Sequence, residues 1–442
     1  MKFYDRKAEL AELQRIQRLA MEDHSRLTVV TGRRRIGKTS LITRACEAKP
    51  TAYLFVSRSN EAVLCRGFVA DVSTALGIYV PEEISSFASL FKFLMQTAQT
   101  MPFNLIVDEF QEFFNINPSI YSDMQNIWDQ YRLKTKMNLI VSGSVYSLMS
   151  RIFESEKEPL FGRSDAIMCL SGFSTETLKE ILHDYAPDYT AEDLLALYTF
   201  TGGVPKYIEQ FCDNNALTKD AMIDFMIREN SMFIDEGKNI LIEEFGKDYG
   251  TYFSILGSIA GGINTQSAIE AAMGGKSIGG NLKRLIEDYN VIRRVRPIMS
   301  KEGTQSVRYE INDNLLRFWF KYINRNRAMI EIGNYRLLGQ IIKDDYPTYS
   351  GLSLERYFKQ QLAESMLYRE IDSWWDPKDK ENQREIDIVA IGEKKNTAFA
   401  FEVKRNGRNY NAALMQEKVA HLKAKVMAKY SIGYGCLSMD DM

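Results

Sequence analysis

The stretch LTVVTGRRRIGKTS, residues 27–40, places an apolar run before one glycine, and a second glycine before a lysine and a threonine. The apolar run predicts a short buried strand, and the residues from Lys38 onward predict a helix. Residues 32–39 match the spacing Gly-x-x-x-x-Gly-Lys-Thr of a phosphate-binding loop. Glycines let the backbone N–H groups surround phosphate oxygens, and the helix that follows offers its positive end. The sequence therefore predicts a strand, a phosphate-binding loop and a helix, in this order.

Two side chains of this loop have expected roles in binding ATP or ADP together with Mg²⁺. Lys38 is expected to reach the β- and γ-phosphates, and Thr39 to ligate the metal ion. A chance glycine turn before a lysine is the alternative, and the flanking strand and helix argue against it. The residues predicted to surround the nucleotide phosphates are Gly32, Arg33, Arg34, Arg35, Ile36, Gly37, Lys38, Thr39 and Ser40.

Four further apolar runs, separated by helical stretches, predict the rest of a sheet. They occupy residues 51–57, 103–110, 137–144 and 166–173. Runs that are apolar nearly throughout are typical of parallel strands buried on both faces. Strands that alternate with helices are typical of α/β proteins, so we predict an α/β domain for the first part of the chain.

Acidic and hydroxyl side chains stand at the ends of two of these runs. Asp108 suits a partner of Mg²⁺, and Glu109 suits the base that activates an attacking water. Ser142 suits a sensor of the γ-phosphate or the water, although a plain strand-to-helix turn is nearly as good an explanation. For the two acids a solvated strand end is the alternative, and the neighbouring phosphate-binding loop favours the functional interpretation.

Length and composition limit the remaining possibilities. The chain has 442 residues, too many for one core, with a net charge of −2 and 45% hydrophobic residues. This charge gives no global attraction to nucleic acid or membrane, so such binding requires local basic patches. Five scattered cysteines favour a reducing compartment, and the charged N-terminus and short apolar runs indicate no signal peptide or membrane span. We expect a soluble cytoplasmic protein.

The middle of the chain predicts two helices and then a hairpin with basic residues. The order of helix, helix and hairpin over residues 245–311 is the outline of a winged helix. Arg293, Arg294 and Arg296 lie on the predicted hairpin and could contact a DNA backbone. Winged helices also serve as packing modules between domains, and the sequence leaves the two roles evenly balanced.

Two alternating strands near the C-terminus bring carboxylates together. In REIDIVAI and AFAFEVKR, the period of two places Glu402 and Lys404 on one face, and a hairpin can bring Asp387 beside them. Carboxylates can hold Mg²⁺, which activates water and stabilises a phosphodiester transition state, while Lys404 orients or neutralises. This arrangement resembles the PD-(D/E)xK nuclease core, in which Glu355 matches the preceding helical acid. A solvated amphipathic hairpin is the alternative.

Six short motifs occur in the order seen in AAA+-like STAND ATPases, and the chain resembles the archaeal-type ATPases among them most. The motifs are FYDRKAEL, TGRRRIGKTSL, LIVDEFQ, LIVSGS, PLFGRSD and TGGVPKY. The resemblance implies that Asp5 and Arg6 pack near the adenine end of the nucleotide. It also implies that Arg163 acts on phosphate charge and that Pro205, with two preceding glycines, shapes a helical lid. From the residues alone, an ion pair explains Arg163 equally well. With its tail, the whole chain resembles an archaeal-type ATPase carrying a DUF234-type domain.

We therefore predict four parts: a P-loop ATPase core (1–170), a helical lid (171–240), a winged helix (241–315) and a PD-(D/E)xK nuclease-like α/β domain (316–442). The expected catalytic residues are Lys38, Glu109, Arg163, Glu355, Asp387, Glu402 and Lys404, with Thr39, Asp108, Asp387 and Glu402 as metal partners. The predicted function is ATP binding and hydrolysis with Mg²⁺-dependent cleavage of DNA. The alternative is a nucleotide-dependent switch or scaffold that binds DNA or protein without cleavage. An oligomer is compatible with either.

Overall fold

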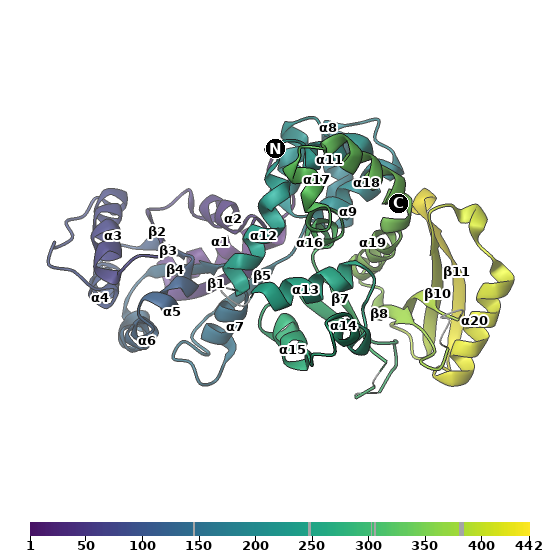
Figure 1. Ribbon diagram of the computed structural model, residues 1–442. Helices are drawn as coiled ribbons and strands as arrows, with labels where there is room; N and C mark the ends of the chain where they lie inside the picture. The colour runs from purple at the N-terminus through teal and green to yellow at the C-terminus, as the bar shows by residue number, and fades with distance from the viewer. Residues whose placement is uncertain (145, 246–248, 302, 305, 380–383) are drawn as a thin grey trace. The chain divides into compact units, whose positions relative to one another are not determined.

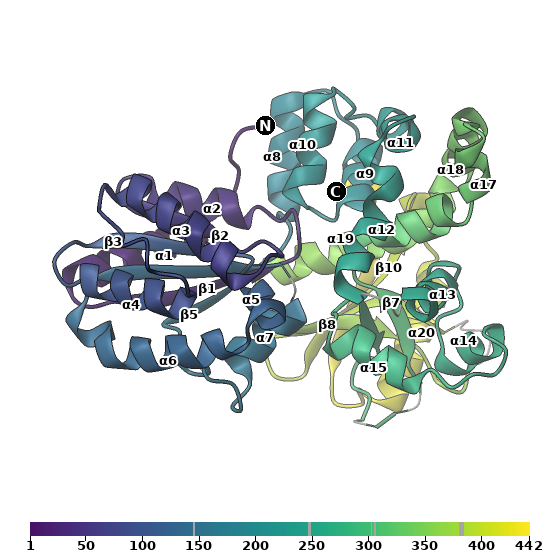
Figure 2. The same cartoon turned by 60° about the vertical axis from the view of Figure 1, so that its left-hand side comes forward.

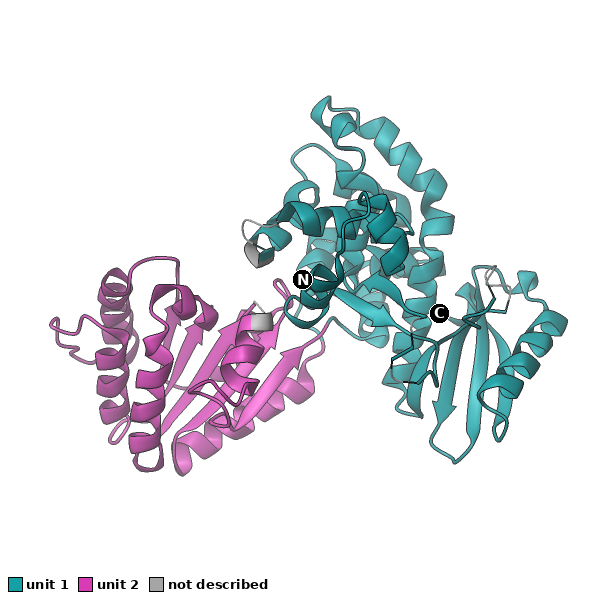
Figure 3. Ribbon diagram, turned by 60° about the horizontal axis from the view of Figure 1, so that its bottom comes forward, with its two compact units in different colours: residues 1–4, 172–442 teal, residues 5–171 magenta. Residues whose placement is uncertain are grey.

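The computed structural model describes residues 1–442 except 145, 246–248, 302, 305 and 380–383. The chain divides into two compact units, one of residues 5–171 and one of residues 1–4 with 172–442 (Figure 3). Within the described residues, no helix is long and apolar enough to cross a bilayer.

A parallel sheet forms the centre of unit 5–171 (Figure 1). Its strands are β1 (Arg26–Gly32), β2 (Thr51–Phe55), β3 (Phe103–Asp108), β4 (Met137–Gly143) and β5 (Ala166–Leu170), in the spatial order β2-β3-β4-β1-β5. Every residue of β3 and β4 is buried, as expected for central strands covered on both faces. The predicted α/β class and the parallel sheet are confirmed.

Helices cover this sheet and connect its strands. They are α1 (Lys7–Glu22), α2 (Lys38–Cys46), α3 (Glu61–Leu76), α4 (Phe87–Thr97), α5 (Phe113–Ile116), α6 (Ser119–Tyr131) and α7 (Tyr146–Glu154), with 3-10 turns η1 (Phe110–Glu112) and η2 (Arg132–Lys134). Helices α4 and α6 lie side by side (Figure 2). Their inner faces join the sheet in one core that includes Phe87, Phe91 and Trp128.

The second unit begins with a helical bundle and a small hairpin. The elements are α8 (Thr175–Tyr185), α9 (Ala191–Thr201), α10 (Pro205–Asp213), α11 (Lys219–Ile227), α12 (Met232–Phe245), α13 (Tyr249–Ala260), α14 (Gln266–Ala272), α15 (Gly279–Glu287), β6 (Ile292–Val295) and β7 (Arg308–Ile311). Strands β6 and β7 pair antiparallel. Three helices thus precede the hairpin where the sequence predicted two.

The C-terminal part of this unit is a sheet preceded by helices. Its elements are α16 (Asn314–Phe318), the π-helical turn η4 (Trp319–Asn324), α17 (Arg327–Glu331), α18 (Tyr335–Tyr349), α19 (Gly351–Glu364), β8 (Tyr368–Trp374), β9 (Ile386–Gly392), β10 (Thr397–Lys404), η5 (Gly407–Asn409), α20 (Ala412–Lys425), β11 (Ser431–Ser438) and η6 (Met439–Asp441). The strand order is β11-β10-β9-β8, with β10 and β11 parallel and the other neighbours antiparallel.

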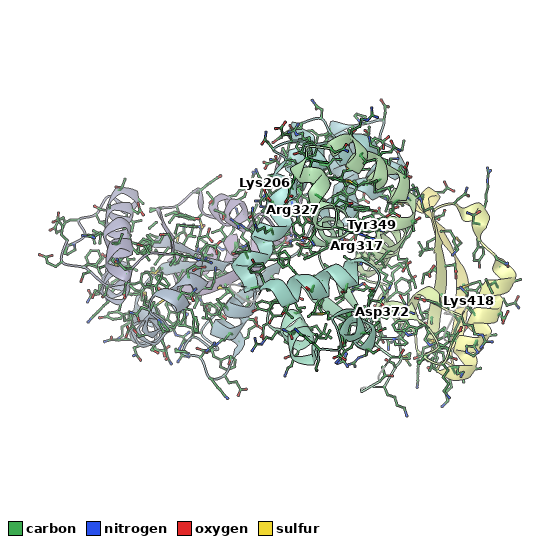
Figure 4. All side chains as sticks on the ribbon, in the orientation of Figure 1. Lys206, Arg317, Arg327, Tyr349, Asp372 and Lys418 are labelled. Atoms are coloured by element: carbon green, nitrogen blue, oxygen red, sulfur yellow. The ribbon has the colours of Figure 1, made fainter. Side chains whose placement is uncertain are left out.

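Helix α19 joins this sheet to the bundle. It packs against α9 and α8 as well as against β8, β9 and β10. Arg317 from α16 lies beside the Tyr349 ring just before α19, with 4.5 Å between the guanidinium carbon and the ring centre (Figure 4). The helical bundle and the C-terminal sheet are therefore held together by buried contacts.

Candidate functional site

The phosphate-binding loop lies between β1 and α2 in unit 5–171. Gly32 and Gly37 have φ angles of 145° and 90°, and Arg35 also lies in the left-handed region at 68°. A side chain on Gly32 would place its Cβ 2.8 Å from the Leu170 carbonyl oxygen, so glycine is required there. These backbone angles are those of a loop that curls its N–H groups toward one point.

Lys38, the first residue of α2, turns its amino group back into this loop. Its Nζ donates to the Gly32 carbonyl at 2.9 Å and to the Arg33 carbonyl at 3.3 Å, and the side chain is buried. Ile36 is buried as well and fixes the loop to the core, whereas Arg34 and Ser40 are exposed. A phosphate held by the loop would contact this ammonium group, so the geometry suits a nucleoside triphosphate.

Asp108, at the carboxyl end of β3, is the centre of a hydrogen-bond network. Its carboxylate accepts from Thr39 Oγ1 at 3.0 Å, from the Tyr53 hydroxyl at 2.6 Å, from the Glu109 N–H at 3.0 Å and from the Ser142 hydroxyl. Burial of the carboxyl raises its pKa, but these hydrogen bonds outweigh burial and hold the pKa of Asp108 below its usual value. The carboxylate stays ionised beside Thr39, which is the donor set that Mg²⁺ prefers.

Glu109 follows Asp108 with a left-handed backbone, at φ 53°. Its carboxylate accepts from Ser144 Oγ at 2.9 Å and from Gln111 Nε2 at 2.6 Å. The side chain is only half-buried, so a water molecule could reach it. Sequence reasoning assigned no role to Gln111 or Tyr53; a polar residue between the buried Phe110 and Phe113 was the available signal for Gln111.

Arg6 lies at the same edge of the sheet as the loop. Its guanidinium donates to the Ser171 carbonyl and to Glu9, and the side chain is buried. Ser171 directly follows β5, whose Leu170 pairs with Gly32. Asp5 is exposed and shares the left-handed backbone of Arg6. Pro205 is the first residue of α10 and belongs to the other compact unit.

Arg163 is not brought to the loop. It donates to Asp129 at 2.9 Å and to the Phe161 carbonyl at 2.9 Å. It precedes β5, and the neighbouring Asp165 N–H bonds to the Leu27 carbonyl near the start of β1. The loop begins at the other end of β1, about 17 Å away along the strand. Within one chain, Arg163 therefore fills the ion-pair role that was the alternative to action on phosphate.

A second cluster of charged groups lies on the C-terminal sheet. Asp387 on β9 accepts from the Val403 N–H of β10 at 2.7 Å. Burial, together with the charge of Glu402, raises the pKa of Asp387 to about 6. Burial and the charge of Asp387 raise the pKa of Glu355, on α19, to about 8. Asp387 is thus close enough to both Glu355 and Glu402 for like-charge repulsion, and a cation bound there would relieve that repulsion.

Lysines already neutralise part of this cluster. Glu402 accepts from Lys418 Nζ at 2.9 and 3.1 Å and from Lys404 Nζ at 3.1 Å. Lys418 lies on α20 and is buried (Figure 4). The sequence analysis missed it, although a lysine inside the apolar stripe of Met415, Val419 and Leu422 was a readable signal. Over the residues that the structure places, no three His, Cys, Asp or Glu side chains are arranged as a ready metal site. A metal ion would have to compete with Lys418 for Glu402.

The basic hairpin is partly engaged in packing. Arg293 on β6 pairs with Glu310 on β7 at 2.8 Å, and Arg356 of α19 reaches the same Glu310 oxygen at 2.8 Å. Arg294 is exposed and Arg296 half-buried. Of the three arginines predicted to face DNA, Arg293 is thus paired with Glu310 inside the hairpin, and Glu310 in turn connects the hairpin to Arg356 of α19, which favours the packing alternative.

Comparison with known proteins identifies two domains. Residues 3–211 match the ATPase domain found predominantly in Archaea, and residues 319–415 match DUF234, described as Archaea bacterial proteins of unknown function. An uncharacterised protein of Methanocaldococcus jannaschii is 29% identical over 411 residues, which span 91% of this chain and 87% of that protein.

Two solved structures align with most of the chain. A Walker-type ATPase of Pyrococcus abyssi aligns over 72% of this chain and 96% of its own, with 18% identity and a TM-score of 0.54. The ORC2 protein of Aeropyrum pernix aligns over 75% of this chain and 96% of its own, with 13% identity and a TM-score of 0.47. The Pyrococcus likeness shows that the architecture is that of a P-loop ATPase.

Proposed function

We propose that this chain, which carries an ATPase domain of the predominantly archaeal type and a DUF234 domain, hydrolyses ATP with Mg²⁺ and uses nucleotide binding to control DNA cleavage by its C-terminal domain. The observation that carries the ATPase half is the bond between Thr39 and Asp108 beside the buried Lys38, because these three groups meet where the phosphates and their metal ion would lie.

Each residue at this site then has a defined task. The loop N–H groups and Lys38 hold the phosphates, while Thr39 and Asp108 hold Mg²⁺ directly or through water. When bound, the ion neutralises charge that develops on the phosphates. Glu109 accepts a proton from the attacking water, and Ser142 fixes Asp108 from the neighbouring strand. Asp5 and Arg6 line the adenine end, Pro205 shapes the lid, and Arg163 contributes only if it acts on a neighbouring molecule.

The nuclease half rests on the acid cluster of Glu355, Asp387 and Glu402 with Lys404. Mutual repulsion of the acids favours a divalent cation, which would polarise a phosphodiester and activate water. Lys404, held beside Glu402, would then face the charge of the scissile phosphate. The hairpin and helices α13 to α15 form the proposed winged helix, in which Arg294 and Arg296 contact the DNA backbone.

One observation favours the second candidate function. Glu402 is paired with two lysines, so its negative charge is already neutralised and a metal ion would have to displace one of them. In that case the chain is a nucleotide-dependent switch or scaffold whose tail binds DNA or protein without cutting it.

Hydrolysis of radiolabelled ATP by the Glu109→Gln variant tests the ATPase proposal. We expect nucleotide affinity close to that of the unchanged chain and turnover reduced by about 100-fold or more, because the general base is lost. Turnover at the original rate in a folded Glu109→Gln variant would remove Glu109 as the base. Absence of hydrolysis by the unchanged chain with Mg²⁺ would refute the ATPase itself.

A further inference from the structure

Gln111 lies two residues after Glu109, the candidate base, in unit 5–171. The proposed function gives this glutamine no role. It lies on the 3-10 turn η1, which is separated from the last residue of β3 by Glu109 alone. The side chain is 1% exposed. A buried amide at a strand end, so close to a candidate base, has to be explained by its contacts.

The backbone of this turn is held in place from three sides. The Phe110 ring packs against Phe113, Tyr121 and Phe153, with ring centres 5.4–5.7 Å apart. The Tyr121 hydroxyl also donates to the Phe110 carbonyl at 3.3 Å and to the Gln111 carbonyl at 3.4 Å. Gln111 therefore projects from a fixed turn, and its amide has little freedom to leave the site.

The amide of Gln111 has one donor directed at the candidate base. Its Nε2 donates to Glu109 Oε2 at 2.6 Å, and Ser144 Oγ donates to the same carboxylate at 2.9 Å. An ionised carboxylate can only accept hydrogen bonds, so the nitrogen of the amide must face Glu109. Two donors from two different segments thus fix a carboxylate whose own backbone is left-handed.

The other end of the amide explains a glycine in the neighbouring strand. A Cβ on Gly143, the last residue of β4, would lie 2.3 Å from Gln111 Oε1. This oxygen is buried and has no hydrogen-bond partner within the described part of the chain. Leaving a buried carbonyl unsatisfied costs about 1–3 kcal/mol, so the amide is held there for its N–H group and not for its oxygen.

We propose that Gln111 is a positioning residue for ATP hydrolysis, which holds the carboxylate of Glu109 in the orientation that accepts the proton of the attacking water. This inference rests on the proposed function. Gln111 acts through its bond to Glu109, so its removal should lower kcat and leave nucleotide binding intact.

A double-mutant cycle on the full chain tests this. In Gln111→Met, we expect kcat for ATP to fall about 10-fold, with KM changed by no more than about 2-fold. In the Glu109→Gln background, measured under single-turnover conditions, adding Gln111→Met should change the residual rate by less than about 2-fold, because the residue through which it acts is gone. The matched control is Gln17→Met, since Gln17 is also a buried glutamine of this unit but donates to Asn104 and Ala45.

The outcomes separate the inference from its premise. An unchanged kcat in Gln111→Met, or the same 10-fold loss in the Glu109→Gln background, would overturn the positioning role while leaving the ATPase in place. If Gln111→Met does not fold, Gln111→Glu keeps the shape of the side chain and replaces the donor by an acceptor, and the same cycle is run with it. Turnover by Glu109→Gln at the original rate would instead refute the base on which the inference depends.

Discussion

At the level of single residues, Asp108 connects the phosphate-binding loop to two neighbouring strands. Thr39 reaches it from α2, Tyr53 from β2 and Ser142 from β4. The carboxylate is thereby fixed and kept ionised before any metal ion arrives. In the proposed function, this order would precede the binding of a cation and its phosphates.

The first residue-scale prediction concerns Lys38. In Lys38→Ala the buried ammonium group that faces the loop is lost, so ATP affinity should fall by about 100-fold or more. Isothermal titration with ATP and Mg²⁺ measures this, and Lys49→Ala, at an exposed position after α2, is the matched control. Unaltered affinity in a folded Lys38→Ala variant would refute the loop as the nucleotide site.

Sequence alone could place Lys38, Thr39, Asp108 and Glu109 because each belongs to a motif with fixed spacing. It could not place Tyr53, since the contact depends on the β2–β3 register that brings Phe55 beside Asp108. It could not decide between the two roles of Arg163 either, because the partner Asp129 is 34 residues away on α6. Both contacts join residues that are far apart in the sequence, so they can be known only from the folded structure.

At the level of secondary-structure elements, the acid cluster belongs to three of them: α19, β9 and β10. The three acids come from different elements, and their closeness arises only where those elements meet. The strand period correctly placed Glu402 beside Lys404, which bond directly. Lys418 comes from a fourth element, α20, so a two-strand pattern could not include it.

The acid cluster should make stability depend on pH. Because the pKa values of Asp387 and Glu355 lie above their ordinary values, the folded chain binds more protons than the unfolded chain between about pH 4 and pH 8. Stability should therefore decrease as the pH rises through this range. Asp387→Asn removes one of the repelling charges and should stabilise the protein by about 1–3 kcal/mol at pH 8, with less effect at pH 5.

Scanning fluorimetry at both pH values measures the apparent Tm of this variant. Glu370→Gln, at an exposed acid on β8, serves as the control and should leave the Tm unchanged. A lower Tm for Asp387→Asn at pH 8 would contradict the repulsion on which the proposed metal site depends.

The hairpin and α19 share the carboxylate of Glu310. Arg356 and Arg293 both pair with it and hold the pKa of Glu310 at about 2, against the effect of burial. Glu310→Gln would leave two arginines without their acid, and we expect the free energy of unfolding to fall by about 2–4 kcal/mol. The decrease should be smaller than for a fully buried ion pair, because Arg293 is partly exposed. Chemical denaturation measures this, with Arg294→Gln on the paired strand β6 as the control. Equal stability of Glu310→Gln and the unchanged chain would show that this network does not hold the hairpin.

At the level of the whole molecule, residues 172–442 form one compact unit although the sequence suggested three separate parts. Contacts between residues that lie about half of the chain's length apart in the sequence hold these parts together. Glu364 of α19 accepts from the Thr175 N–H at the start of α8 at 3.0 Å, and Arg405, just after β10, pairs with Glu192 of α9. Composition shifts along the chain could mark its elements, but could not show that these elements pack into one compact unit.

This arrangement gives the C-terminal acids a physical link to helices α8 and α9, which lie within the residues that match the ATPase domain. Glu355 lies on the same helix as Glu364 and Arg356, so a shift of α8 or α9 would move α19 and one of the three acids. In the proposed function, α19 is the element that would carry nucleotide-dependent control to the C-terminal domain.

Cleavage of labelled single-stranded, duplex and branched DNA, with Mg²⁺ or Mn²⁺ and with or without ATP, tests the proposed function most directly. We expect the unchanged chain to cut at least one substrate, at a rate that depends on ATP, and Asp387→Ala to cut none of them. No cutting by the unchanged chain on any substrate with either metal would contradict the nuclease proposal and leave a nucleotide-dependent switch or scaffold.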